Sequence, residues 1–133
     1  MTIKTLEIST KAHSQMIDIT REVAFEISES AVTRGVCRIF VPHTTAAVTV
    51  NESADPDVAA DILMSLEKLV PWKDNYGHGE GNSAAHIKAT LVGPDLTLLV
   101  EEGKFLLGTW QGIFLCEFDG PRTRKVFVRV DET

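Results

Sequence analysis

Residues 96–130 read LTLLVEEGKFLLGTWQGIFLCEFDGPRTRKVFVRV, and this stretch decides the fold class. It contains three runs rich in β-branched and aromatic residues, at 96–100, 109–118 and 125–130, which predict three strands. Turn residues separate the runs at Glu101–Gly103 and Asp119–Pro121. Strands joined by such short connections favour a largely antiparallel sheet.

Four more strand patterns lie upstream of this stretch. Alternating residues at 3–9 and 14–19 predict an opening hairpin. Two β-rich runs, at 35–41 and 45–50, predict a pair of strands joined at a tight corner. The chain therefore contributes strands from both of its ends to the predicted sheet.

Helical spacing occurs in three places between the strands. The first helix is predicted from Thr20, with Gly35 in the left-handed conformation after its end. The second begins at Asp55-Pro56, where the carboxylate can cap free amides, and ends at Pro71. The third covers 83–91. The order of elements predicts a single α+β domain, residues 1–133, with a mixed, largely antiparallel sheet and two to three helices packed on one face.

The composition restricts the class of protein. The 133 residues are 44% hydrophobic and 24% charged, with a net charge of -6, which is typical of a globular domain. This charge disfavours non-specific binding to nucleic acid or to an anionic membrane surface. The sequence has no export signal and no run of about 18–20 apolar residues, so we expect a cytoplasmic protein. Cys37 and Cys116 lie in apolar runs without CxxC spacing and are predicted to be buried free thiols.

Three of the four histidines lie in polar segments. His43 follows a predicted strand, His78 lies in the glycine-rich stretch 71–82, and His86 lies in the first turn of the next helix. Neutral imidazole is a common metal ligand, and three imidazoles leave one position of a zinc ion open. The spacing matches no zinc motif, so scattered surface or hydrogen-bonded histidines remain an alternative. His13 has no polar cluster near it in the sequence and is interpreted as an exposed turn residue.

Other polar residues cluster near these histidines. Asn51 follows the strand predicted at 45–50, and Glu80 and Asn82 lie between His78 and His86. Glu80 can act as a general base on a metal-bound water or can orient a ligand histidine. The segment Gly108-Thr-Trp-Gln-Gly112 places an aromatic side chain and an amide between two glycines. Close approach of a ligand or backbone explains this segment, and so does a bulge beside a core tryptophan.

Five motifs together resemble one family. They are His43-Thr-Thr-Ala-Ala, Asn51-Glu-Ser-Ala-Asp-Pro56, His78-Gly-Glu-Gly-Asn82, His86-Ile-Lys-Ala and Gly108-Thr-Trp-Gln-Gly-Ile113. In this order they resemble the YjbQ-like proteins, also called secondary thiamine-phosphate synthase enzymes. The resemblance covers nearly the whole chain, and GTWQG is its most distinctive part.

The resemblance implies a compact α+β homotrimer that binds a divalent metal, with zinc favoured, through His43, His78 and His86. It also implies a transferase that joins a hydroxymethylpyrimidine diphosphate to a thiazole phosphate with release of pyrophosphate. On this hypothesis Glu80, Asn51 and Asn82 are catalytic. The residues expected to contact substrate are Lys88, Trp110, Gln111 and Arg122, with Arg124 as a further phosphate contact.

Two alternatives to the transferase stay open. One is a zinc-assisted hydrolase of a small phosphorylated or acyl substrate, in which Glu80 deprotonates the bound water. The other is a non-catalytic trimer, in which the histidines bind metal for stability or storage.

Overall fold

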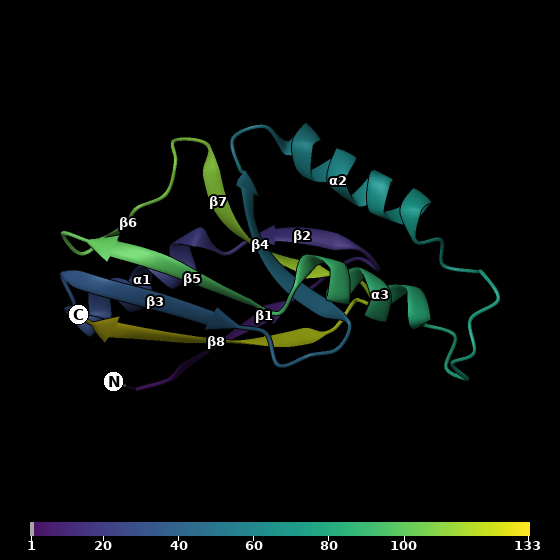
Figure 1. Ribbon diagram of the computed structural model, residues 1–133, viewed down its shortest axis with the longest axis horizontal. Coiled ribbons are helices and arrows are strands. Elements are labelled where there is room, and N and C mark those ends of the chain that lie inside the picture. The colour runs from purple at the N-terminus through teal and green to yellow at the C-terminus, as the bar shows by residue number, and fades with distance from the viewer. Residues whose placement is uncertain (1) are drawn as a thin grey trace.

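The computed structural model describes residues 2–133, and its strands form two sheets rather than one (Figure 1). The five-stranded sheet has the order β1-β8-β3-β5-β6, and the three-stranded sheet has the order β2-β7-β4. Every strand pairing among residues 2–133 is antiparallel. The elements are β1 (Lys4–Ser9), β2 (Gln15–Asp18), α1 (Thr20–Ser30), β3 (Arg34–Phe40), β4 (Ala46–Glu52), α2 (Pro56–Leu69), α3 (Ser83–Val92), β5 (Asp95–Glu101), β6 (Lys104–Phe105), β7 (Gln111–Glu117) and β8 (Thr123–Glu132).

The main core lies between the two sheets and α1. Inward residues of β3 and β8 alternate with outward residues, as expected for strands buried on one face. Helix α1 adds Val23 and Ile27 to this core, and each is at most 2% exposed. Ile39 and Leu115 bring the two sheets into the same cluster. This two-sheet core is the largest continuous apolar region of the described chain.

A second core covers the outer face of the three-stranded sheet. There Ala85 and Ala89 of α3 pack with Phe114, Cys116 and Phe118. Figure 1 shows α2 and α3 together at one side of the molecule and α1 at the other end. The α+β prediction is therefore confirmed, but the helices do not share one face of one sheet.

The predicted opening hairpin is wrong, because β1 pairs with β8 while β2 pairs with β7. The segment between them carries the chain from one sheet to the other. The strands predicted to meet at a corner, β3 and β4, likewise belong to different sheets. Alternation identifies a strand and its buried face, but it does not identify the partner strand.

The end of α1 differs from the prediction as well. Ala31, with φ of 57°, takes the left-handed position, and Gly35 lies inside β3 instead. A Cβ atom on Gly35 would lie 2.0 Å from the Asp131 carbonyl oxygen. Gly35 therefore permits close backbone approach of β3 and β8 rather than ending a helix.

The second helix begins as predicted. The Asp55 carboxylate accepts a hydrogen bond from the amide of Asp57 at 2.9 Å, and Pro56 occupies the first turn. The short strand β6 follows a turn at Glu102 and Gly103, and sequence patterns missed it. Among residues 2–133, no helix has the length and apolar character that crossing a membrane requires.

Candidate functional site

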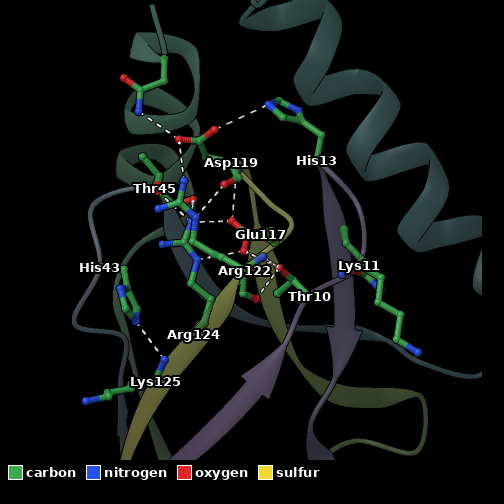
Figure 2. Close-up of polar contacts among 12 residues, drawn as sticks. Thr10, Lys11, His13, His43, Thr45, Glu117, Asp119, Arg122, Arg124 and Lys125 are labelled. Atoms are coloured by element: carbon green, nitrogen blue, oxygen red, sulfur yellow. Dashed lines mark hydrogen bonds and ion pairs between the residues drawn. The ribbon is translucent and has the colours of Figure 1, made fainter. Parts of the chain in front are cut away.

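A buried ion pair connects the two sheets where β7 ends and β8 begins. Glu117 accepts hydrogen bonds from Arg124 Nε at 2.8 Å and from Arg124 Nη2 at 2.5 Å. Thr10 Oγ1 donates to the same carboxylate at 2.8 Å, and Arg124 Nη2 also donates to Thr45 Oγ1 at 2.7 Å. Figure 2 shows these four side chains meeting at one point. Because every charged oxygen and most donors are engaged, the pair is a structural connection between the sheets.

The charge on Glu117 is retained despite its burial. Burial alone would raise the pKa of this carboxyl. Hydrogen bonds from Arg124, the Asp119 amide and Thr10 outweigh that effect, so the pKa of Glu117 lies below its ordinary value. The carboxylate is therefore the form that the fold stabilises.

Asp119, two residues further on, joins three separate segments. Its Oδ2 accepts from Asn82 Nδ2 at 3.0 Å and from Arg122 Nη2 at 3.2 Å. Its Oδ1 lies 3.8 Å from Nε2 of His13. The His13 ring also packs edge-on against Trp72, with ring centroids 4.4 Å apart. His13 is an exposed turn residue, as predicted, and it also has an acidic and an aromatic partner.

His43 lies between β3 and β4, beside the start of β8. Its Nε2 accepts the backbone N–H of Lys125 at 2.9 Å (Figure 2). Burial and the positive charge of Arg124 lower the pKa of His43. A nitrogen that accepts a backbone hydrogen bond carries no proton, so the neutral ring has its own proton on Nδ1. His43 lines a shallow hollow with Phe40, Pro42, Pro94 and Arg122.

His78 and His86 form the second histidine group. Their rings lie 5.5 Å apart between centroids and are perpendicular, across the junction of the 70–82 loop with α3. His78 is exposed and His86 is half-buried. Within residues 2–133, no three His, Cys, Asp or Glu side chains are placed so that they could hold one metal ion. One chain thus brings His78 and His86 together but does not add His43 to them.

The two other polar residues of this loop differ in their surroundings. Glu80 is exposed and forms no ion pair with any described residue. Asn82 is held through its Nδ2 by Asp119, while its Oδ1 is buried and has no hydrogen-bond partner in the described chain. A buried acceptor of this kind is costly unless a ligand or ordered water completes it. Asn82 therefore presents one buried acceptor that a ligand or an ordered water would complete.

The predicted phosphate contacts are not equally available. Lys88 is 1% exposed, and its ammonium pairs with Glu67 of α2. Arg124 is 2% exposed and is paired with Glu117. The side chain of Arg122 is 49% exposed and shares Asp119 with Asn82. Of these three cations, only Arg122 has part of its guanidinium group exposed to solvent.

The remaining predicted residues lie at the other end of the three-stranded sheet. Asn51 pairs with Gly112 in the register of β4 and β7, whereas Ala46, close to His43, pairs with Glu117. Five residues of strand separate these two ends by about 17 Å. Trp110 is 62% exposed, and the Gln111 side chain accepts the Gly108 amide at 2.8 Å. Within one chain, the residues predicted to form the site therefore lie in two separate groups.

The GTWQG segment is a turn that leads into β7. A Cβ atom on Gly112 would lie 2.6 Å from Cβ of Ser53, which explains why glycine is needed there. The group that comes close to Gly112 is therefore the Ser53 side chain. Trp110 projects outward, so the alternative of a bulge beside a core tryptophan is wrong.

Sequence analysis did not identify Glu117 and Asp119 as site-forming residues. A signal for Glu117 was present, since it is the one charged residue in the apolar run IFLCEF. An acid within such a run predicts a buried cationic partner. No comparable signal marks Asp119, because its partners come from distant segments.

The two thiols take no part in this polar cluster. Cys37 and Cys116 are free and buried, as predicted. Burial raises the pKa of each thiol to about 12, so neither is a nucleophile at neutral pH.

Known proteins place the chain in a family. The model of the UPF0047 protein YjbQ-like family matches residues 4–133. The chain belongs to the YjbQ-like UPF0047 family. It is 49% identical over 129 residues to the UPF0047 protein YugU of Bacillus subtilis, covering 96% of this chain and 98% of that protein. A UPF0047 protein of Methanocaldococcus jannaschii is 51% identical over 124 residues, covering 93% and 90% of the two chains.

Solved structures of YjbQ-like proteins share the fold. A crystal structure of an uncharacterised YjbQ/UPF0047 protein from Clostridium acetobutylicum is 51% identical, with a TM-score of 0.95 over 96% of this chain and 99% of that one. A YbjQ-like protein of unknown function from Sulfolobus solfataricus is 34% identical, also with a TM-score of 0.95, over 99% and 97% of the two chains. The two-sheet architecture is therefore common to bacterial and archaeal members.

Proposed function

We propose that this YjbQ-like protein is a cytoplasmic, metal-binding transferase of the thiamine-phosphate synthase type, assembled as a homotrimer. The metal is divalent, with zinc favoured. The reaction joins a hydroxymethylpyrimidine diphosphate to a thiazole phosphate. The thiazole nitrogen forms a bond to the pyrimidine methylene carbon, and the carbon–oxygen bond breaks so that pyrophosphate leaves with the electron pair.

The main support is the paired arrangement of His78 and His86 next to Asn82. Two imidazoles at a loop–helix junction supply two of the nitrogen ligands that zinc accepts. The buried Oδ1 of Asn82 offers an acceptor to a donor group of a ligand. Arg122 offers a partly exposed guanidinium, a geometry suited to phosphate oxygens.

Lys88 has a different part in this proposal. Its ammonium is already neutralised by Glu67, and it lies 6.0 Å from the Phe118 ring centroid. It therefore connects α3 to α2 and positions the histidine-bearing helix rather than contacting phosphate.

The test is formation of thiamine phosphate from the two substrates by purified protein. We expect turnover by the wild type that His78→Ala abolishes. His13→Ala is the matched control, because it removes an imidazole close to the same polar cluster and should retain most activity. Equal product from the wild type and His78→Ala, or none from either, would contradict the transferase.

A zinc-assisted hydrolase is the second candidate, and the position of Glu80 favours it. Glu80 lies between the two histidines in the sequence, is exposed, and has no ion-pair partner in the described chain, so its carboxylate is available as a base. Hydrolysis of simple phosphate or acyl esters should then disappear on chelation, return with zinc, and be lost in Glu80→Gln. An unchanged rate in Glu80→Gln would exclude this role.

A further inference from the structure

We propose that the 70–82 loop binds a small planar aromatic phosphate, with Trp72 and Tyr76 contacting the ring and Lys73 contacting the phosphate. This site deepens the proposed function, on which the identity of the substrates rests, because both substrates of that reaction are heteroaromatic rings that carry phosphate groups. None of the three side chains belongs to the five sequence motifs.

The 70–82 loop forms an open hollow. The hollow measures about 570 Å³, which is within the range of small-molecule sites, and its lining residues all lie between 72 and 81. Figure 1 shows this loop extending from the end of the molecule, between α2 and α3. His78, one of the histidines proposed as metal ligands, lines the same hollow. A ligand bound here is therefore next to the proposed reactive centre.

Two aromatic side chains, Trp72 and Tyr76, line this hollow. Each is half-buried rather than free in solvent. Trp72 packs against the second core, and the Tyr76 hydroxyl donates a hydrogen bond to the Pro71 carbonyl at 2.6 Å. Aromatic side chains that are held in place in this way offer flat apolar surfaces, so a planar ring can stack on them at little entropic cost.

Lys73 adds a positive charge to the same hollow. Its side chain is exposed and forms no ion pair with any residue in the range 2–133. An ammonium group without a partner is available to a phosphate. Asp74 lines the hollow as well, and its negative charge opposes the binding of an anion. Removal of these two neighbouring charges should therefore change phosphate binding in opposite directions.

Gly77 lies between Tyr76 and His78, and nothing in the described chain requires a glycine there. Its backbone is not in the left-handed region, and a Cβ atom at this position would meet no other atom within 4 Å. The side chains on both sides of it line the hollow. A ligand that covers these two side chains comes close to the backbone between them, and a glycine leaves that space open.

The first experiment measures binding of phenylphosphonate, whose carbon–phosphorus bond is cleaved neither by the proposed transferase nor by a phosphate-ester hydrolase. Trp72 and Trp110 are the two tryptophans of the chain, so the fluorescence of Trp110→Phe reports on Trp72. Phenylphosphonate should change this fluorescence with a saturable dependence on concentration. Methylphosphonate, which has the charged group but no ring, should not. Unchanged fluorescence with phenylphosphonate, or an equal change with methylphosphonate, would overturn the aromatic site.

The second experiment compares dissociation constants for phenylphosphonate by calorimetry. Lys73→Gln should weaken binding about tenfold, because a charge-assisted hydrogen bond is lost, and Asp74→Asn should strengthen it. Lys104→Gln is the matched control, since it removes an exposed positive charge from β6, at the opposite end of the molecule (Figure 1). Equal weakening by Lys73→Gln and Lys104→Gln would show that only the net charge matters and would overturn the phosphate contact.

The ring contact is tested at Tyr76 and Gly77. Tyr76→Ala should weaken phenylphosphonate binding about tenfold, whereas Tyr76→Phe keeps the ring and should stay within about threefold of the wild type. Gly77→Ala should weaken binding without lowering the melting temperature, because the added methyl group meets no atom of the chain. Wild-type affinity in both Tyr76→Ala and Gly77→Ala would contradict this placement of the ring.

The binding site and the proposed reaction can fail separately. Phenylphosphonate binding that requires Tyr76 and Lys73, in a protein that forms no thiamine phosphate, would confirm the site and contradict the transferase. Formation of thiamine phosphate at a rate that Tyr76→Ala leaves unchanged would contradict the site and leave the transferase intact.

Discussion

Cys37, Ile39 and Leu115 are fully buried between the two sheets, whereas none of the residues of α2 on the outer face of the three-stranded sheet is fully buried. The sandwich core is built from branched aliphatic side chains. The helix layer uses alanines, with partly buried Leu63 and Leu66. Because the contribution to stability increases with the apolar area that is buried, the core between the two sheets supplies most of the stability. The helix layer, which carries His78 and His86, belongs to the region expected to open most easily.

The largest expected effect comes from the ion pair that joins the sheets. Glu117→Gln leaves Arg124 buried without a counter-charge and should lower the free energy of unfolding by about 3–5 kcal/mol. Glu101→Gln is the control, because its partner Arg34 is exposed and solvent screening leaves the pair little effect on stability. Urea unfolding of the two variants measures the loss of stability in each. Similar losses in the two variants would show that the buried pair is not a special connection.

The second prediction compares the two cores directly. Ile39→Ala in the sandwich should cost about 2–5 kcal/mol, the usual effect of emptying a fully buried position. Leu63→Ala on α2 should cost less than half of that, because the side chain is only partly buried. Thermal unfolding of both variants tests the order. If Leu63→Ala were the more damaging, the helix layer would be part of the main cooperative unit.

The third prediction concerns the cap of α2. Asp55→Ala removes the acceptor of the Asp57 amide and should destabilise the helix by about 1 kcal/mol. If the helix layer opens separately, amide exchange in α2 should accelerate while exchange in β3 stays unchanged. Equal acceleration in both elements would show that the two layers unfold together.

The smallest effect is the pH dependence of His43. Because its pKa is lowered in the folded protein, the unfolded chain takes up a proton first as the pH falls below about 6.5. The free energy of unfolding should therefore decrease from this pH until the folded protein also binds the proton. His43→Gln should reduce this dependence. A variant with the same pH profile as the wild type would contradict the assignment to His43.

Local patterns predicted most elements but not their partners. Some features depend only on adjacent residues, such as the cap at Asp55, the strand pattern at 125–130 and the apolar alternation of β3. The division into two sheets depends on pairings such as Lys4 with Val128, and nothing in either strand specifies them. Sequence patterns therefore predicted the class of the fold and missed its topology.

The candidate site shows the same limit. Glycine-rich loops and helix starts are visible in the sequence, and they led to the prediction of a site at Asn82, His78 and His86. They did not predict that Asp119 holds Asn82, or that Lys88 is buried against Glu67. Nor did they separate Asn51 from His43, because that distance is set by the length of β4.

The two buried thiols offer a way to follow each layer by chemical labelling. Cys37 lies in the sandwich core and Cys116 in the core beneath the helices. A thiol reagent modifies either residue only after its surroundings open, so the labelling rate at each position reports the opening frequency of one layer. Peptide mapping of the labelled protein then separates the two rates in a single sample. The natural sequence thus already contains one reporter for each layer, and no introduced probe is needed.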